Sequence, residues 1–322
     1  MSVKQFWRLL KATFREWNED KASRLAAALA YYTVFSIAPV LVIAIAIAGA
    51  IFGEDAARGQ IVGQIQGLVG REGAEVIETA IANAGQPDSN EGLIASLINI
   101  GLLIFGATGV FAELQGALNT IWEVAPKPDR GVWNFIRQRF LSFSMVLVIG
   151  FLLMVSLVVN AALATISGFM SGLLPGVDWV WQLAEFAISL GVITVLFALI
   201  FKFLPDVEIR WNDVWIGAAL TAVLFTIGRS LLGLYLGQSA FGSTYGAAGS
   251  LVVIVAWVFY SAQILFFGAE FTQVYTHRYG SQIRPSENAI PLTPEDRAQQ
   301  GIPRREYLEE MARKYDQDSY NS

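Results

Sequence analysis

Long apolar segments separated by short polar connections run through most of this chain. Asp, Glu, Lys and Arg are absent from four long stretches, which lie between Arg24 and Glu54, Glu91 and Glu113, Arg139 and Asp178, and Arg229 and Glu270. A bilayer core about 30 Å thick needs about 20 apolar residues per helix. The pattern therefore predicts an all-α, polytopic integral membrane protein, a bundle of six spans near 25–52, 92–113, 140–164, 179–201, 213–236 and 250–275.

The segment before the first span has the pattern of an amphipathic helix over residues 3–20. Phe6, Leu10, Phe14 and Trp17 recur at helical spacing, and basic residues occupy the other side. Basic residues opposite aromatic ones suit a helix that lies in the lipid headgroup layer. The alternative is a cytoplasmic helix that packs against the bundle.

Three regions are predicted: 1–24 as an N-terminal amphipathic cytoplasmic helix, 25–276 as the six-span domain and 277–322 as a polar cytoplasmic tail. The one sizeable polar insertion between spans is 54–91, where the apolar spacing favours two short amphipathic helices on the outer surface. The tail has too few apolar residues for a core of its own. We expect one short helix in it, near 303–315.

Charge supports a membrane location and orients the spans. Only 15% of the residues are charged, whereas soluble domains carry roughly 25%. Lys and Arg gather before the first span, in 123–139, in 202–212 and just after the last span, whereas the opposite connections hold only Arg58 and Arg71. Because basic connections stay on the cytoplasmic side, both termini are predicted to be cytoplasmic.

Four charged residues within or at the ends of predicted spans are functional candidates: Glu113, Glu185, Arg229 and Glu270. An ionised group inside a span costs about 2.5–3.5 kcal/mol on insertion scales. Glu185 and Arg229 fall in the outer half, where they could form an ion pair that only sets helix register. Glu113 and Glu270 fall near the inner ends, where they could simply reach water.

Asn119 and Asp206 are further polar candidates, at or near the inner ends of the second and fourth spans. For Asn119 the alternative is a structural role, because amide side chains in membrane helices commonly hydrogen-bond across helix interfaces.

Two places have unusual backbone chemistry. Pro39 lies inside the first span and predicts a kink, because it cannot donate to the carbonyl of Phe35. The Gly/Ser-rich run before the last span includes Gly242, Gly246 and Gly249. Such a run could re-enter the membrane and expose backbone groups to a cavity. The alternative is a plain turn before a glycine-rich helix start.

Residues typical of soluble enzymes are scarce. The chain has no cysteine, which excludes disulfides and thiol nucleophiles, and His277 is its single histidine. No HExxH, P-loop or GxSxG motif occurs. We therefore expect no enzymatic activity, no cofactor and no metal. The basic residues are explained by membrane orientation, so no nucleic-acid partner is expected. The expected partners are membrane lipids, with a homo-oligomer left open.

Several blocks of sequence carry a family resemblance. They are Gly106 to Gln115 with Leu118 to Trp122, Phe203 to Asp206 with Gly217-Ala218, Tyr245 to Ser250 with Trp257 and Gly268-Ala269-Glu270, and Tyr31 to Pro39. In order and spacing these blocks resemble the YihY/BrkB family of bacterial inner-membrane proteins, historically labelled ribonuclease BN, over about residues 5–280. The resemblance implies a six-helix inner-membrane protein and transfers no catalytic residues.

Three functions remain in competition. The first is transport or translocation of a lipid, ion or small solute, which predicts a water-accessible cavity that reaches Glu113, Glu270 or Arg229. The second is a non-catalytic membrane scaffold in envelope assembly or partner binding, for which these charges would be structural. The third is a ribonuclease, as the old family label says, although the sequence offers no acid–base or metal constellation for it.

Overall fold

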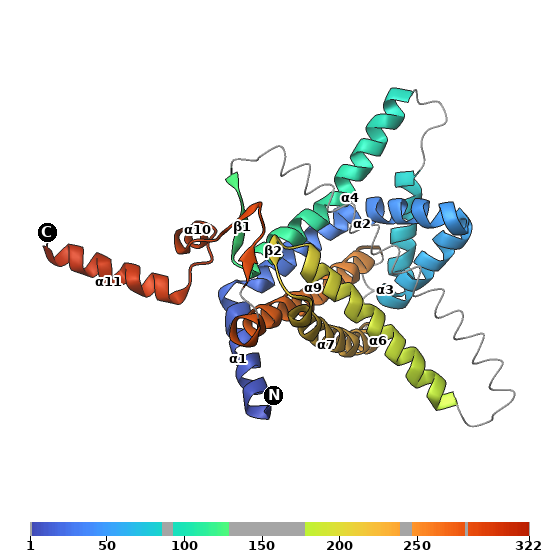
Figure 1. Ribbon diagram of the computed structural model, residues 1–322. Helices are drawn as coiled ribbons and strands as arrows, with labels where there is room; N and C mark the ends of the chain where they lie inside the picture. Colours follow the sequence, from blue (N-terminus) through green and yellow to red (C-terminus); the bar gives the residue numbers. More distant parts are fainter. Residues whose placement is uncertain (1, 86–92, 129–177, 239–246, 281–282, 322) are drawn as a thin grey trace.

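The computed structural model describes residues 2–85, 93–128, 178–238, 247–280 and 283–321, and these are almost entirely helical (Figure 1). Within these ranges, five helical segments are long and apolar enough to cross a membrane: Ala22–Ala50, Gly101–Ile121, Trp179–Phe203, Trp211–Leu232 and Leu251–Tyr279. They confirm the predicted all-α, multi-pass membrane fold. The predicted third span, 140–164, lies outside the described residues, as do Gly242 and Gly246.

The observed elements follow the predicted spans closely. The helices are α1 (Val3–Glu19), α2 (Ala22–Phe52), α3 (Glu54–Gly85), α4 (Leu93–Ile121), α6 (Asp178–Phe203), α7 (Trp211–Gln238), α9 (Ala247–Tyr279), α10 (Pro294–Gln299) and α11 (Arg305–Asn321). The strands are β1 (Val124–Pro126), β2 (Val207–Glu208), β3 (Arg284–Pro285) and β4 (Ala289–Pro291).

Helix α2 continues through Pro39, the residue at which we predict a kink. A Cβ on Gly106 of α4 would lie 3.0 Å from Cγ of Pro39, and one on Gly109 would lie 3.3 Å from Oγ of Ser36. Two glycines therefore let α4 approach the part of α2 that lacks a backbone hydrogen bond. The helix ends at Gly53, whose φ of 88° is accessible to glycine without strain.

Helix α3 doubles back on itself. Arg58 Nη2 and Glu78 Oε1 are 3.8 Å apart, whereas a straight helix would separate these residues by about 30 Å. Beyond the bend, Ile77 packs with Ile45 of α2 and Ile254 of α9. The sequence predicts two short amphipathic helices for this insertion, whereas the structure has one helix, bent into two arms that pack along the spans. Its location on the outer side stays a prediction.

Helices α7 and α9 pack closely through a reciprocal glycine–threonine contact. A Cβ on Gly217 would lie 1.7 Å from Oγ1 of Thr272, and a Cβ on Gly268 would lie 1.8 Å from Oγ1 of Thr221. Each threonine hydroxyl donates to the carbonyl four residues earlier on its own helix, which satisfies it. Small residues at both contacts bring the two helices together and set their register.

The four strands and the tail close one end of the bundle, here called the strand-capped end. β1 pairs with β4 and β2 pairs with β3, both antiparallel. Because β1, β2 and β3 follow α4, α6 and α9, the pairing ties three helix ends together. The sequence predicts a polar tail with one short helix. The structure extends that helix as α11 and adds β3, β4 and α10, with Leu292 and Ile302 buried.

Basic side chains hold the tail in place at this end. Lys21 and Lys127 donate to the carbonyl oxygens of Gly301 and Glu287, both at 2.7 Å, and Arg24 donates to that of Gln300 at 3.2 Å. These residues belong to segments for which we predict a shared cytoplasmic side. The structure places them at the same end of the molecule, and the side of the membrane that this end faces stays a prediction.

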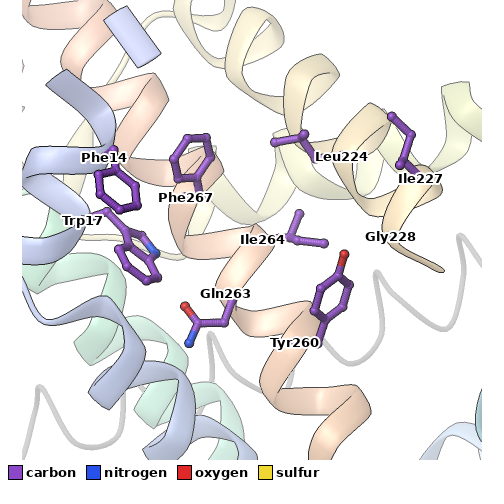
Figure 2. Close-up of a pocket in the computed structure, with 9 residues that line it drawn as sticks. All are labelled: Phe14, Trp17, Leu224, Ile227, Gly228, Tyr260, Gln263, Ile264 and Phe267. Carbon is purple, nitrogen blue, oxygen red and sulfur yellow. The ribbon is translucent and has the colours of Figure 1, made fainter. Parts of the chain in front are cut away.

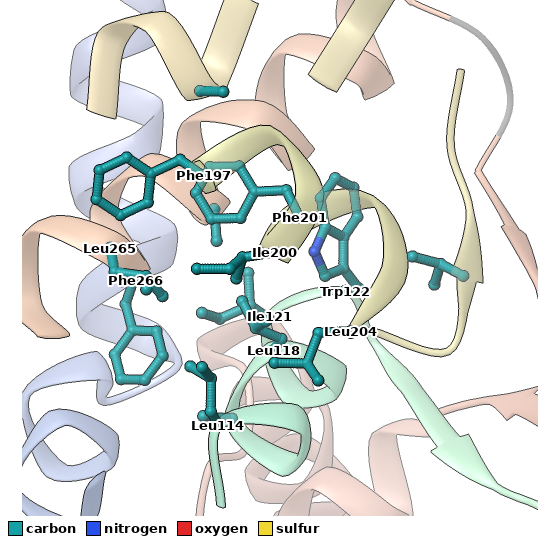
Figure 3. Close-up of a cluster of buried hydrophobic side chains, with 14 of the residues drawn as sticks. Leu114, Leu118, Ile121, Trp122, Phe197, Ile200, Phe201, Leu204, Leu265 and Phe266 are labelled. Carbon is teal, nitrogen blue, oxygen red and sulfur yellow. The ribbon is translucent and has the colours of Figure 1, made fainter. Parts of the chain in front are cut away.

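The largest apolar core also lies toward the strand-capped end, where the helices converge (Figure 3). Leu118 and Ile121 of α4 pack there with Phe201 of α6 and Phe266 of α9, each fully buried. Toward the opposite end, α4 and α6 diverge (Figure 1). Polar side chains can therefore be enclosed by protein mainly at the strand-capped end, where the helices lie close together.

Candidate functional site at the strand-capped end

Glu270 is the most unusual polar residue in the part of the chain that the structure describes. Its side chain has no solvent exposure, and neither carboxylate oxygen has a hydrogen-bond partner among the described residues. Buried polar groups are paired in the great majority of native proteins. A buried carboxylate without a partner needs a proton, a cation or a hydrogen-bond donor from a ligand.

Helical spacing places Glu270 on a polar face of α9. Gln273 and His277 lie three and seven residues further along, so all three side chains share one side of the helix. His277 is exposed, Gln273 is 5% exposed and Glu270 is fully buried. The face therefore runs from water at the strand-capped end down to the buried carboxylate.

A pocket of about 200 Å³ lies over the upper part of this face. Its walls come from α1, α9, the turn after α4 and the tail, with lining residues Ala12, Arg15, Glu16, Glu123, Gln273, Val274, His277, Arg278 and Arg304. The lining contains both acidic and basic side chains, together with the amide of Gln273 and the imidazole of His277. Gln273 and Val274 belong to this lining, and Glu270 precedes them by about one turn of α9, on the buried side.

An ion-pair network supports the wall of the pocket. Arg304 pairs with Glu123 and, at 3.5 Å, with Glu16. Arg297 pairs with Asp20 in full burial and lies 3.7 Å from Glu123. Burial raises the pKa of Asp20 to about 6, although Arg297 acts in the opposite direction. These contacts tie α1 with its C-cap, the turn after α4 and the tail together near the polar face.

Asp206 and Asn119 form a second polar cluster. Nδ2 of Asn119 and Nε2 of Gln115 donate to Oδ2 of Asp206, at 2.9 and 3.1 Å. The backbone N–H of Asp206 donates in return to Oδ1 of Asn119 at 2.8 Å. The cluster joins α4 to the turn after α6 and is nearly fully buried. Its reciprocal bonds favour the structural alternative for Asn119, although its function stays a prediction.

The other charged candidates are not drawn into this site. Glu113 is half-buried, while Glu185 and Arg229 are both exposed. The ion pair that we consider for Glu185 and Arg229 is not formed between these two described residues. Gly249 is buried near the start of α9, so the described part of the candidate flexible run is already helical.

Sequence reasoning missed Asp20, Gln273 and Arg297. Asp20 and Arg297 are far apart in the chain and look like ordinary surface charges, so their burial follows only from the docking of the tail. One signal was available, because Thr293 and Asp296 form a capping box that places Arg297 on a short helix. Among the described residues, no group of three His, Asp or Glu side chains is placed to hold a metal ion.

Comparison with known proteins identifies similar membrane proteins. The family model described as virulence factor BrkB matches residues 13–292, so the match extends past residue 280, where we expected the resemblance to end, and includes β3 and β4. UPF0761 membrane proteins of Verminephrobacter eiseniae and Rhodospirillum centenum are 26% and 28% identical, over 83% and 80% of this chain. The chain covers 62% and 55% of these relatives' lengths. No solved structure matches the chain.

Proposed function

Because this chain belongs to the virulence factor BrkB family of membrane proteins, and because Glu270 is buried with no hydrogen-bond partner among the described residues, we propose that it transports a cation or a small amine-bearing solute. The pocket over Glu270 is its access site from the strand-capped end. That end is assigned to the cytoplasm of a bacterial inner membrane from the distribution of Lys and Arg. The proposed transport function requires no catalytic residues.

The burial of Glu270 without a partner carries the proposal. A carboxylate accepts hydrogen bonds and cannot donate them when ionised, so its natural ligands are cations, ammonium groups and protons. If residue 270 served only packing, an apolar side chain would give a more stable fold, because an unpaired buried charge is strongly destabilising. The burial of Glu270 is explained if its carboxylate binds a proton and a cationic ligand in turn during transport.

Transport also requires a route between the pocket and the carboxylate. In this structure Gln273 and Val274 separate the two, so Glu270 is closed off from water. A carrier that exposes its site to one side at a time passes through closed states of this kind. The step proposed here is a local movement of α1 or the tail that uncovers Glu270 from the strand-capped end.

Cysteine accessibility tests the route directly, because the natural chain contains no cysteine. Gln273→Cys and Glu270→Cys are made singly, and full-length proteins in membrane vesicles are exposed to a small charged thiol reagent from either side. We expect Gln273→Cys to react from the cytoplasmic side only. Glu270→Cys should react more slowly than Gln273→Cys and from the same side, and the transported cation should slow the reaction of Gln273→Cys, in which Glu270 is intact.

Flux measurements test the function itself. Proteoliposomes are loaded with a pH-sensitive dye and exposed to sodium, potassium or a small primary amine. The wild-type chain should exceed protein-free liposomes for at least one of these, and Glu270→Gln should reduce that flux at least tenfold. Glu185→Gln, which changes an exposed carboxylate, serves as the matched control and should retain it. Wild-type vesicles that equal empty ones for every cation would refute the proposal.

A scaffold function is the second candidate, and α11 is the observation that favours it. Leu308, Met311 and Tyr315 recur on one side of this helix, and all three are exposed. The helix projects away from the bundle (Figure 1). A scaffold would lose partner capture when α11 is removed while Glu270→Gln leaves capture unchanged, which distinguishes it from transport.

A further inference from the structure

A second cavity, distinct from the pocket over Glu270, lies between α1, α7 and α9 (Figure 2). Its volume of about 340 Å³ falls in the range of small-molecule sites. The walls are almost wholly apolar and include Leu224 of α7 with Ile264 and Phe267 of α9. Two of these walls are membrane-spanning helices, so the surroundings of this groove are lipid rather than water.

The groove opens outward instead of being sealed by the bundle. Phe14 and Ile227 line it, and these residues are 58% and 54% exposed. Gly228 lies at its far end, where a Cβ would be only 2.1 Å from the hydroxyl oxygen of Tyr260. Glycine at this position therefore leaves room for the tyrosine ring, which lies against α7 beside the groove.

Two side chains that line the groove add polar groups to its otherwise apolar wall. Nε1 of Trp17 and Oε1 of Gln263 have no hydrogen-bond partner among the described residues. In Figure 2 both side chains lie at the α1 end of the groove. An indole N–H needs an acceptor when it is buried, and ester carbonyls at the base of a lipid headgroup supply one. The glutamine amide can pair with the same polar region.

Charge on α1 indicates which lipid fits. Lys4, Arg8 and Lys11 are all exposed on the helix that closes this end, and α1 contains no acidic residue before Glu16. An exposed basic face next to the headgroup layer attracts anionic phospholipids. The apolar walls, the polar atoms of Trp17 and Gln263 and the basic residues of α1 supply partners for the acyl chain, the ester and the phosphate of such a lipid.

We infer that this groove binds one acyl chain of an anionic glycerophospholipid from the leaflet at the strand-capped end. The ester region lies against Trp17 and Gln263, and the phosphate lies near the basic face of α1. The lipid links α1 to α7 and α9 through a surface that these helices do not fill themselves. This site does not depend on Glu270 or on the transported solute.

Native mass spectrometry of the full-length chain tests the inference. The protein is purified in a neutral detergent and equilibrated with equal amounts of phosphatidylglycerol and phosphatidylcholine. We expect the wild type to retain phosphatidylglycerol preferentially. Leu224→Trp fills the groove and should reduce its retention at least tenfold. Val223→Trp, at the next position on the exposed side of α7, should leave retention unchanged.

Ile227→Trp is a second groove variant, at an exposed position that tolerates a larger side chain without disturbing the core. Reduced retention in both groove variants, with unfolding temperatures equal to the wild type, supports the site. Equal phosphatidylglycerol retention by the wild type, Ile227→Trp and Val223→Trp would overturn it. Equal retention of the two lipids by the wild type would overturn the assignment of an anionic ligand.

Discussion

At the scale of single residues, burial decides which charges matter in this protein. Arg297 and Asp20 are 3% exposed each and depend on one another. Glu185 and Arg229 looked more important in the sequence because they fall within predicted spans, yet both are exposed. A charge near the end of a helix can be buried completely when another segment covers it, and a charge buried in protein needs a partner.

Removal of one partner from the Arg297–Asp20 pair should therefore be costly. We expect Arg297→Met to lower the free energy of unfolding by about 3–5 kcal/mol, because it leaves a buried carboxylate without its cation. The double variant Arg297→Met with Asp20→Leu should recover most of that loss. Thermal unfolding of the detergent-solubilised chain measures both. A single variant as stable as the wild type would show that Asp20 does not depend on Arg297.

At the scale of elements, close packing of α7 on α9 depends on where glycine faces threonine. Gly217 and Gly268 each occupy a position at which a Cβ would overlap the other helix. Gly191 of α6 offers a contrast, because no atom other than the local backbone of α6 lies within 4 Å of a Cβ built there. Composition alone cannot separate these glycines, since their difference lies entirely in what the neighbouring helix places opposite them.

Alanine substitution should therefore destabilise the protein at Gly268 but not at Gly191. Gly268→Ala is expected to lower the free energy of unfolding by about 1–3 kcal/mol, because the added methyl group overpacks the contact with Thr221. Gly191→Ala should be neutral or stabilising by up to about 1 kcal/mol, since alanine favours helix more than glycine does. Unfolding in detergent compares them, and equal effects at the two sites would contradict the packing argument.

At the scale of the whole molecule, the tail holds the ends of the spans together. β3 and β4 pair with the strands that follow α6 and α4, and Arg297 enters the network around Asp20. Lys21, Arg24 and Lys127 then bind backbone carbonyls of the tail. The end of the bundle that carries the pocket over Glu270 is thus assembled from segments distant in sequence.

Two truncations test this arrangement. A chain that ends at residue 304 loses only α11 and should unfold within a few degrees of the wild type. A chain that ends at residue 288 loses β4, α10 and Arg297, and it should be markedly less stable because Asp20 and Glu123 lose their buried cation. Thermal unfolding in detergent separates the two, and equal stability would mean that the docked tail contributes nothing.

The apolar pattern by itself determined that this chain is an all-α membrane protein and where its described spans lie. This follows from local physics, because a backbone in hydrocarbon must satisfy its own hydrogen bonds within each span. Glu270 could also be identified as a functional candidate from the sequence, because a carboxylate in an apolar span is unusual whichever side of the helix it occupies.

Only the tertiary structure decided which polar residues meet. The burial of Asp20 and Arg297, the pairing of the tail strands with the turns after α4 and α6, and the groove beside α1 all join segments far apart in the chain. Their contact free energies depend on packing between elements rather than on the neighbours of each residue along the sequence. The periodicity of a single helix contains no information about what another segment will place against it.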